Sequence, residues 1–303
     1  MISAQDITIV IPTYGREEVL VNSLSDLLAL ETAACEVLLV DQTPEHEPAT
    51  IKALSEWQSK GRVRRLTFSP PSIPHAMNQG LMHANTDYLL YLDDDIIPDD
   101  NLIASLVDAL NNQSTTPQCI AGQVIQPDET VIRFEDWKRS WFPFNSDRSQ
   151  FIDEVMAGNL CVNRAFALKI GGFDENFKGS AYRFESDFAR RVIRAGGKIL
   201  FEPSVSIKHL RAERGGTRIK GNHLTTWRPH HSVGKYYYAF RGGVFEAFKA
   251  VLIQPLRAVR TKHHLRSPWW IPATLCAELL GIFWAIGLLL KGPGFLNRIK
   301  HDL

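Results

Sequence analysis

Apolar, β-branched runs alternate with helical patterns from residue 7 onward, and this alternation constrains the fold more than any other feature. The runs ITIVIPT at residues 7–13 and EVLLVDQT at residues 36–43 have the continuous hydrophobicity of buried strands. Between them, residues 16–30 carry leucines and valines at helical spacing. Strands and helices that alternate in this way predict an α/β fold, with a mostly parallel sheet flanked by helices.

The same alternation organises the rest of the chain. We expect helices at 48–61 and 73–84, strands at 62–68 and 87–93, and in the second half a strand and a short helix within 155–177, then a helix and a strand within 185–210. We therefore predict one domain over residues 1–233, followed by a helical tail at 234–303. Within the domain, residues 1–100 would form the ligand-binding half, and residues 101–233 the half for a second substrate.

Polar side chains follow three of the predicted strands, where ligands bind in sheets of this kind. Thr13 and Tyr14 follow the first strand, Asp41 follows the second, and three aspartates at 93–95 follow the fourth. Three adjacent carboxylates repel one another, so a cation is expected beside them, and Mg²⁺ or Mn²⁺ prefers such oxygen ligands. The alternative of a solvated turn before a helix stays open, and it is the better interpretation of Asp99 and Asp100.

Composition excludes several other classes of protein. The chain has 303 residues, 45% of them hydrophobic and 22% charged, which is an ordinary globular composition. Its four cysteines form no CxxC pair, so neither a zinc site nor a disulfide framework is indicated. The first fifteen residues, MISAQDITIVIPTYG, lack the pattern of a secretory signal. A reducing, cytoplasmic location is therefore expected.

Several motifs together resemble one family of enzymes. The segments VIPTYGR, LLVDQT, AMNQGLMHANTDYLLYLDDD and GNLCVNRAFALKIGGFDENF are similar to those of inverting family 2 glycosyltransferases, whose fold is the Rossmann-like GT-A fold, over about residues 5–215. The aspartate triplet resembles the DxD motif of that family. The resemblance implies Mn²⁺ or Mg²⁺ bound by Asp93, Asp95 and His209, although a lone histidine is often structural.

The resemblance also implies a nucleotide-sugar pocket. Matching positions are Pro12, Thr13, Tyr14, Arg16, Asp41, Asn78, Asp93 and Asp94. The Gly-hinged basic loop RAERGGTR would place Arg211, Arg214 and Arg218 over a diphosphate, with a solvated surface loop as the alternative. Gln42 stands where Asn or Asp is more usual, so UDP-, GDP- and dTDP-sugars all remain candidate donors.

Inversion at an anomeric carbon also requires a base near the acceptor hydroxyl. The segment RFESDFARR occupies the place of the acidic element that supplies this base in the family. Glu185 falls at the expected position and Asp187 is the second candidate, because the usual Glu-Asp pair is absent. Both would also suit a helix N-terminus without any catalytic role.

The tail has a different character from the body. Residues 235–303 carry ten Lys and Arg against three Asp and Glu, whereas the preceding residues carry 24 against 30. Residues 235–266 combine these cations with one apolar helical face, and residues 268–290 form an apolar stretch whose single charge is Glu278. We expect residues 235–290 to bind a membrane surface. A true span, and packing onto the domain or onto a second copy in a homodimer, stay open.

The prediction is thus a hexosyltransferase-type, metal-dependent inverting glycosyltransferase, peripheral on the cytoplasmic face of the membrane. It would transfer a sugar to a saccharide or lipid-linked acceptor in cell-surface polysaccharide synthesis. A catalytically degenerate subunit that binds nucleotide sugars is one alternative, and a nucleotidyltransferase is another. Nucleic acid is not expected as a partner, because aliphatic residues separate the cations of the tail without a reader motif.

Overall fold

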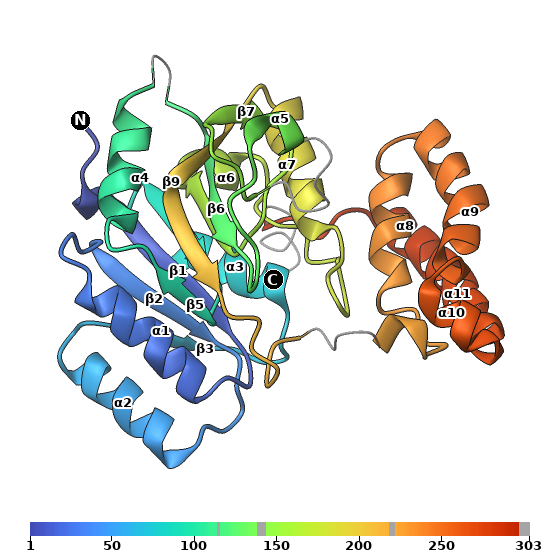
Figure 1. Cartoon of the computed structure of the whole chain (residues 1–303), viewed down its shortest axis with the longest axis horizontal. Coiled ribbons are helices and arrows are strands. Elements are labelled where there is room, and N and C mark those ends of the chain that lie inside the picture. The colour runs from blue at the N-terminus through green and yellow to red at the C-terminus, as the bar shows by residue number, and fades with distance from the viewer. Residues whose placement is uncertain (114–115, 138–143, 218–221, 297–303) are drawn as a thin grey trace. The chain divides into compact units, whose positions relative to one another are not determined.

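The computed structural model describes residues 1–113, 116–137, 144–217 and 222–296, and Figure 1 labels its elements along the chain. The chain forms two compact units. Unit 1 consists of Met1–Pro71, Ala76–Gly172 and Ala189–Gly216, and unit 2 of Ser72–His75, Phe173–Phe188 and Thr217–Leu303. Arg218, one of the predicted diphosphate contacts, lies outside the described residues. The boundary near residue 233 stays a prediction.

Unit 1 is built on a sheet of nine strands within the described residues, in the order β3-β2-β1-β4-β8-β6-β9-β5, with β7 paired to β9. The strands are β1 Ile7–Thr13, β2 Glu36–Asp41, β3 Arg64–Thr67, β4 Tyr88–Leu92, β5 Ile96–Pro98, β6 Cys119–Ile125, β7 Gln150–Ile152, β8 Asn159–Asn163 and β9 Ile199–His209. The helices before the C-terminal bundle are α1 Glu18–Ala29, α2 Pro48–Ser59, α3 Ile73–His83, α4 Leu102–Asn111, α5 Phe134–Trp137, α6 Arg164–Lys169 and α7 Phe184–Arg194, with a short η1 at Ala4–Asp6. Of these, α3 and α7 each begin in unit 2 and end in unit 1.

The first four strands form the predicted parallel half of the sheet. β1 pairs in parallel with β2 and with β4, and β2 pairs in parallel with β3. The chain therefore extends the sheet first to one side of β1 and then to the other. A crevice forms outside the carboxyl ends of two strands where the order reverses in this way. β8 runs antiparallel to both β4 and β6, which makes the complete sheet mixed.

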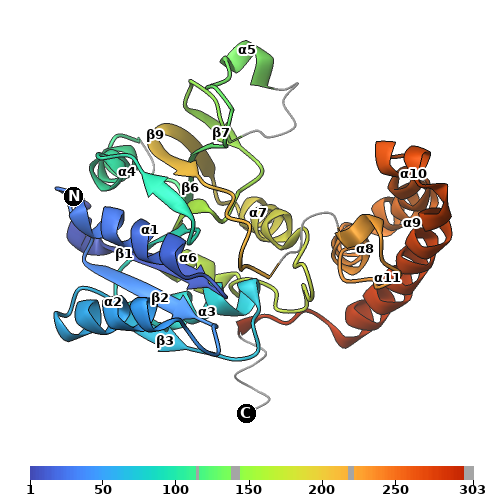
Figure 2. The same cartoon turned by 60° about the horizontal axis from the view of Figure 1, so that its bottom comes forward.

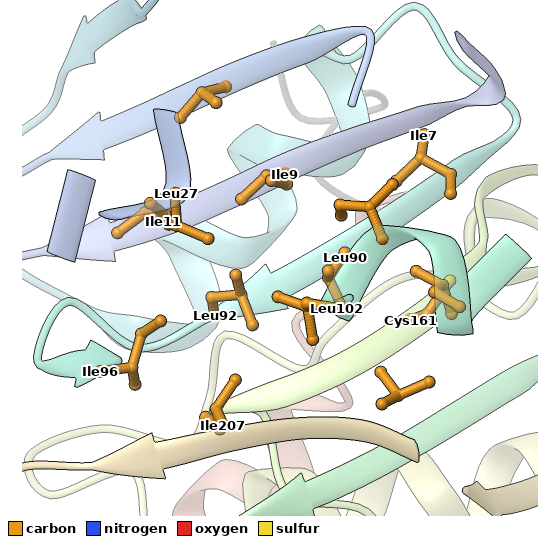
Figure 3. Packing of buried hydrophobic residues seen from close by; sticks show 14 of the residues in the cluster. Ile7, Ile9, Ile11, Leu27, Leu90, Leu92, Ile96, Leu102, Cys161 and Ile207 are labelled. Atoms are coloured by element: carbon orange, nitrogen blue, oxygen red, sulfur yellow. The ribbon is translucent and has the colours of Figure 1, made fainter. Parts of the chain in front are cut away.

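One face of the sheet packs against α1, α2 and α4. Alternate strand residues such as Ile9 and Leu90 point to this face and meet leucines such as Leu27 and Leu102, as Figure 3 shows. These side chains are buried. Burial of a large aliphatic side chain contributes about 1.5–3 kcal/mol, so this layer stabilises the strands that carry the polar residues at their ends.

The opposite face packs against α3. The Tyr91 hydroxyl donates to the Met77 carbonyl oxygen over 2.8 Å. A Cβ on Gly80 would lie 2.6 Å from Val10, so glycine permits this close contact between helix and strand. The helix predicted at 73–84 is thus confirmed as α3, Ile73–His83.

Unit 2 contains a small helical bundle, in which Figures 1 and 2 both show α8, α9 and α11 side by side. Its helices are α8 Ser232–Phe240, α9 Val244–Val259, α10 Lys262–Arg266 and α11 Ile271–Lys291, with short η2 Asn222–Leu224 and η3 Pro268–Trp270. The predicted basic helix is broken at Gly243, whose φ of 127° favours glycine. Among the described residues, Pro268–Lys291 alone is long and apolar enough to cross a membrane, by length and composition only.

Candidate metal and nucleotide site

Two carboxylates and an imidazole meet at the carboxyl end of β4. One ligand atom each from Asp93, Asp95 and His209 lies within 4.8 Å of the others. The Nε2 atom of His209 is 3.3 Å from Asp95 Oδ1 and 3.6 Å from Asp93 Oδ2. Two oxygens and one imidazole nitrogen suit Mn²⁺ and are compatible with Mg²⁺, so these residues fit the divalent cation that the sequence predicts.

Strand pairing explains why residues 114 positions apart meet here. β5 pairs antiparallel with β9, and the register places Ile96 opposite His209. Asp95 precedes Ile96, so this pairing brings the histidine beside the aspartate. Asp93 depends on a glycine, because a Cβ on Gly158 would lie 2.4 Å from Asp93 Oδ2. The predicted DxD segment is thus positioned by contacts from two distant parts of unit 1, β9 and Gly158.

The electrostatics favour the charged forms of this cluster. Burial acts to raise the pKa of Asp95, but hydrogen bonds and charges from His209, Ala212 and Arg16 outweigh it and lower the value. Burial acts to lower the pKa of His209, but the two carboxylates raise it above its usual range. The His209 site therefore attracts positive charge, which is the property that a cation site requires.

Asp94 points to different partners. Its Oδ2 accepts a 2.6 Å hydrogen bond from Thr13 Oγ1, and its Oδ1 lies 3.1 Å from Arg16 Nε. Burial raises the pKa of Asp94 to about 7, while the Arg16 charge and the Thr13 hydrogen bond act in the opposite direction. Thr13 and Arg16, which come from the end of β1 and the turn after it, thus both contact Asp94 after β4, and all three are predicted pocket residues.

The basic loop, residues 210–216, packs on the turn that follows β1. Arg16 Nη1 donates to the carbonyl oxygens of Ala212 and Arg214, and Gly216 N donates to the Tyr14 oxygen over 2.7 Å. Gly215 permits this approach, since a Cβ there would lie 2.5 Å from the Gly15 carbonyl oxygen. The structure thus brings the basic loop to the nucleotide-pocket residues that the sequence predicts.

The two described arginines of this loop already have partners. Arg211 Nε donates to Gln126 Oε1 over 2.7 Å, and Arg214 pairs with Glu47 in an exposed ion pair. Arg211 also has a φ of 53°, a left-handed conformation that costs a non-glycine residue about 1 kcal/mol or more. A diphosphate role for these arginines would require them to exchange these partners.

Asp41 lies in a buried network at the end of β2. Its Oδ2 is 2.8 Å from His46 Nε2 and 2.7 Å from Arg65 Nη2, and its Oδ1 accepts from the Thr43 backbone over 2.9 Å. His46 in turn contacts Glu17 over 3.1 Å. Asp41 is fully buried, so a direct contact with a nucleotide base would require a change in this network.

The remaining predicted pocket residues are placed by elements of unit 1. Pro12 lies in β1 opposite Val40, Tyr14 is half-buried in the turn after β1, and Asn78 is fully buried in α3. Their roles in nucleotide binding stay predictions.

Both candidate bases lie in unit 2, in the first turn of α7. Glu185 is half-buried, whereas Asp187 is buried with its Oδ1 3.0 Å from Arg241 Nη1. The same guanidinium pairs with Asp174, whose Oδ2 accepts from the Tyr237 hydroxyl over 2.9 Å. Asp187 thus belongs to a buried ionic network with Arg241 and Asp174.

Sequence reasoning did not identify several residues of the site. Gln126 and His46 contact predicted site residues, and Glu17 contacts His46, but none of the three carries a recognisable motif. Gln126 directly follows β6, and recognising that strand would have marked it as a strand-end residue. Glu17 and His46 lack even this signal, because their contacts form only in the folded chain.

Comparison with solved structures defines the fold. A mannosyltransferase, PcManGT, from Pyrobaculum calidifontis in complex with GDP-Man and Mn²⁺ is 20% identical, with a TM-score of 0.55, over 95% of this chain and 79% of its own. GalNAc-T7 with UDP, GalNAc and Mn²⁺ is 14% identical, with a TM-score of 0.56, over 77% of this chain and 50% of its own. TarS of S. aureus is 11% identical, with a TM-score of 0.54, over 82% of this chain and 42% of its own.

These likenesses establish a GT-A-like fold, which the sequence predicted. The sequence model of glycosyl transferase family 2 matches residues 8–171, more than half of the chain. The protein therefore belongs to glycosyl transferase family 2. No curated protein matches the sequence.

Proposed function

We propose that this protein is a metal-dependent, inverting glycosyltransferase that uses a nucleotide sugar. The observation that carries the proposal is the cluster of Asp93, Asp95 and His209 at the crevice of a family 2 fold. A divalent cation held there would neutralise the charge that develops on the departing nucleoside diphosphate. Mn²⁺ accompanies GDP-Man in one structural relative, and UDP with GalNAc in another, which supports Mn²⁺ and a nucleotide-sugar donor for this chain.

The chain's own residues would bind and orient the donor. Thr13, Arg16 and Asp94 are linked at the carboxyl ends of β1 and β4, and Arg211 and Arg214 lie on the loop that packs against Arg16. Guanidinium groups match phosphate oxygens in geometry and charge, so these arginines suit a diphosphate. Arg211 and Arg214 would release Gln126 and Glu47 to make those contacts.

We propose Glu185 as the general base that accepts the proton of the acceptor hydroxyl. Asp187 is buried and paired with Arg241 inside unit 2, so its carboxylate would have to leave this ion pair to accept a proton from an acceptor hydroxyl. Ala181 and Arg183 have φ values of 49° and 73° just before Glu185. Unfavourable backbone conformations of this kind concentrate at functional sites.

A donor panel tests the proposal. Release of nucleoside diphosphate from UDP-, GDP- and dTDP-sugars is measured with Mn²⁺, with Mg²⁺ and with EDTA, for the wild type and Asp95→Ala. Metal-dependent release from one donor, lost in the variant, is the expected result. Metal-dependent nucleotide binding without release would point to a missing acceptor or to a binding subunit, and no nucleotide binding at all would contradict the proposal.

We further propose that the helical bundle binds the cytoplasmic face of a membrane, where a lipid-linked acceptor would be presented for cell-surface glycan synthesis. Phe245, Phe248, Leu252 and Leu256 are exposed along one face of α9, and Leu279, Phe283, Ile286 and Leu290 are exposed along α11. Exposed cations accompany them at Lys249, Arg257, Arg260, Lys262 and Arg266. Apolar faces flanked by cations suit an anionic bilayer surface.

The charge within the apolar tail is compatible with this role. Glu278 is buried and lies 2.6 Å from Lys235 Nζ, and it accepts a 2.6 Å hydrogen bond from the Tyr236 hydroxyl. It therefore does not have to face lipid. Sedimentation with anionic and with neutral vesicles tests the proposal: binding to anionic vesicles, lost in Phe248→Glu, is expected. Self-association without vesicle binding would instead favour a homodimer contact.

A further inference from the structure

Gln126 connects the candidate metal ligand His209 to the basic loop. It directly follows β6 and is buried. Its Oε1 atom lies 3.2 Å from His209 Nδ1 and 2.7 Å from Arg211 Nε. No family motif marks this residue.

The identity of these atoms follows from their chemistry. A guanidinium can only donate hydrogen bonds, so the Gln126 atom that faces Arg211 Nε must be the amide oxygen. The same oxygen faces His209 Nδ1, and an oxygen can only accept from an N–H group. Nδ1 therefore carries a proton, and Nε2 is the nitrogen left to face the two carboxylates.

We propose that Gln126 is the positioning residue that presents His209 Nε2 to the divalent cation. This inference rests on the metal site of the proposed function and adds a residue to it. A histidine that binds a metal through one nitrogen is oriented by the partner of its other nitrogen, and loss of such a partner weakens metal binding. Without the Gln126 oxygen, the imidazole could rotate and exchange its two nitrogens.

The same Gln126 oxygen also stabilises the start of the basic loop, through its hydrogen bond with Arg211. Arg211 stands two residues after His209 with its left-handed φ of 53°. The hydrogen bond from Arg211 to Gln126 helps to hold this conformation, so one amide fixes both the ligand and the start of the basic loop. Because Gln126 orients the imidazole of His209, replacing Gln126 should change both the metal affinity of the site and the position of that imidazole.

Mn²⁺ binding to the full chain tests the proposal, through titration followed by electron paramagnetic resonance. Gln126→Ala should raise the Mn²⁺ dissociation constant by about 10–100-fold, and at saturating Mn²⁺ it should weaken the pulsed-resonance signal of a directly bound imidazole nitrogen. Gln126→Glu keeps an acceptor for Nδ1 and should restore both the affinity and the nitrogen signal.

Gln123→Ala is the matched control. Gln123 is buried within β6, three residues before Gln126, and its side chain bonds to Ser146 and Ser206 and not to a residue of the cation cluster. It should lower thermal stability without changing Mn²⁺ binding. Unchanged affinity and nitrogen signal in Gln126→Ala would overturn the inference alone, as would equal losses in Gln126→Ala and Gln123→Ala. Absence of Mn²⁺ binding in the wild type would overturn the metal site itself, and the inference with it.

Discussion

The position of Asp93 depends on the absence of a side chain at residue 158. A Cβ there would approach Asp93 Oδ2 to 2.4 Å, well inside van der Waals contact. Gly158→Ala should therefore displace the carboxylate and weaken Mn²⁺ affinity by about 10-fold, by analogy with the loss of other groups that position metal ligands. The measurement is a Mn²⁺ titration of the purified variant.

Gly287→Ala provides the control for that variant. Its Cβ would meet no atom within 4 Å, and the residue lies inside α11. Alanine is a better helix former than glycine by up to about 1 kcal/mol, so this variant should be neutral or stabilising and should bind Mn²⁺ normally. A Gly158→Ala protein with unchanged Mn²⁺ affinity would remove Asp93 from the set of metal ligands.

At the same scale, the sequence could predict which residues carry chemistry but not which residues hold them. Asp93, Asp95 and His209 were recognisable from their motif and its resemblance, and the structure brings them together. Gln126 was not recognisable, because its role consists of two hydrogen bonds to residues more than eighty positions away. Contacts of this kind follow from strand pairing, which a single sequence does not specify.

Among the elements, the basic loop offers the clearest test of a local geometry. Gly215 has a φ of 87°, and a Cβ on it would lie 2.5 Å from the Gly15 carbonyl oxygen. Gly215→Ala should separate the basic loop from the turn after β1, which should raise hydrogen exchange at residues 210–216 and weaken nucleotide binding.

Gly196→Ala is the control that separates the strain of a left-handed backbone from the steric contact between the basic loop and the turn after β1. Gly196 has a similar φ of 78°, but a Cβ there would meet nothing within 4 Å. Both variants are therefore destabilised by about 1 kcal/mol, because alanine is strained in a left-handed conformation. Only in Gly215→Ala would the new Cβ also clash with another residue, Gly15. Equal exchange rates at residues 210–216 in the two variants would count against a docked loop.

The elements also differ in how well the sequence predicted them. The alternation of β1 to β4 with α1 to α3 was clear, since long apolar runs separate amphipathic helices. The three-residue strands β5 and β7 were not predicted, because periodicity cannot be measured over so short a segment. β5 matters most, since its pairing with β9 places His209 beside Asp95.

For the whole molecule, the candidate metal ligands and the candidate base belong to different compact units. Glu185→Gln should therefore leave Mn²⁺ and nucleotide binding unchanged while lowering kcat by at least about 100-fold, as expected for loss of a general base. Asp95→Ala should lose both binding and turnover. Calorimetry and steady-state kinetics on the same preparations separate these effects.

The variant Asp187→Asn tests whether Asp187, and not Glu185, is the general base. Its carboxylate contacts Arg241 in a buried position, so the variant should cost about 1–3 kcal/mol of unfolding free energy and keep most of its turnover. The reverse pattern, in which Asp187→Asn abolishes turnover and Glu185→Gln does not, would transfer the catalytic role to Asp187.

The measurement that tests the central claim most directly is the position of Mn²⁺ in crystals grown with a nucleoside diphosphate. Anomalous scattering locates the ion without assumptions about activity. The account predicts an ion coordinated by Asp95 and His209, with Asp93 bound directly or through water, and with phosphate oxygens completing its shell. A bound nucleotide with no Mn²⁺ at these residues, or Mn²⁺ at other residues of the chain, would contradict it.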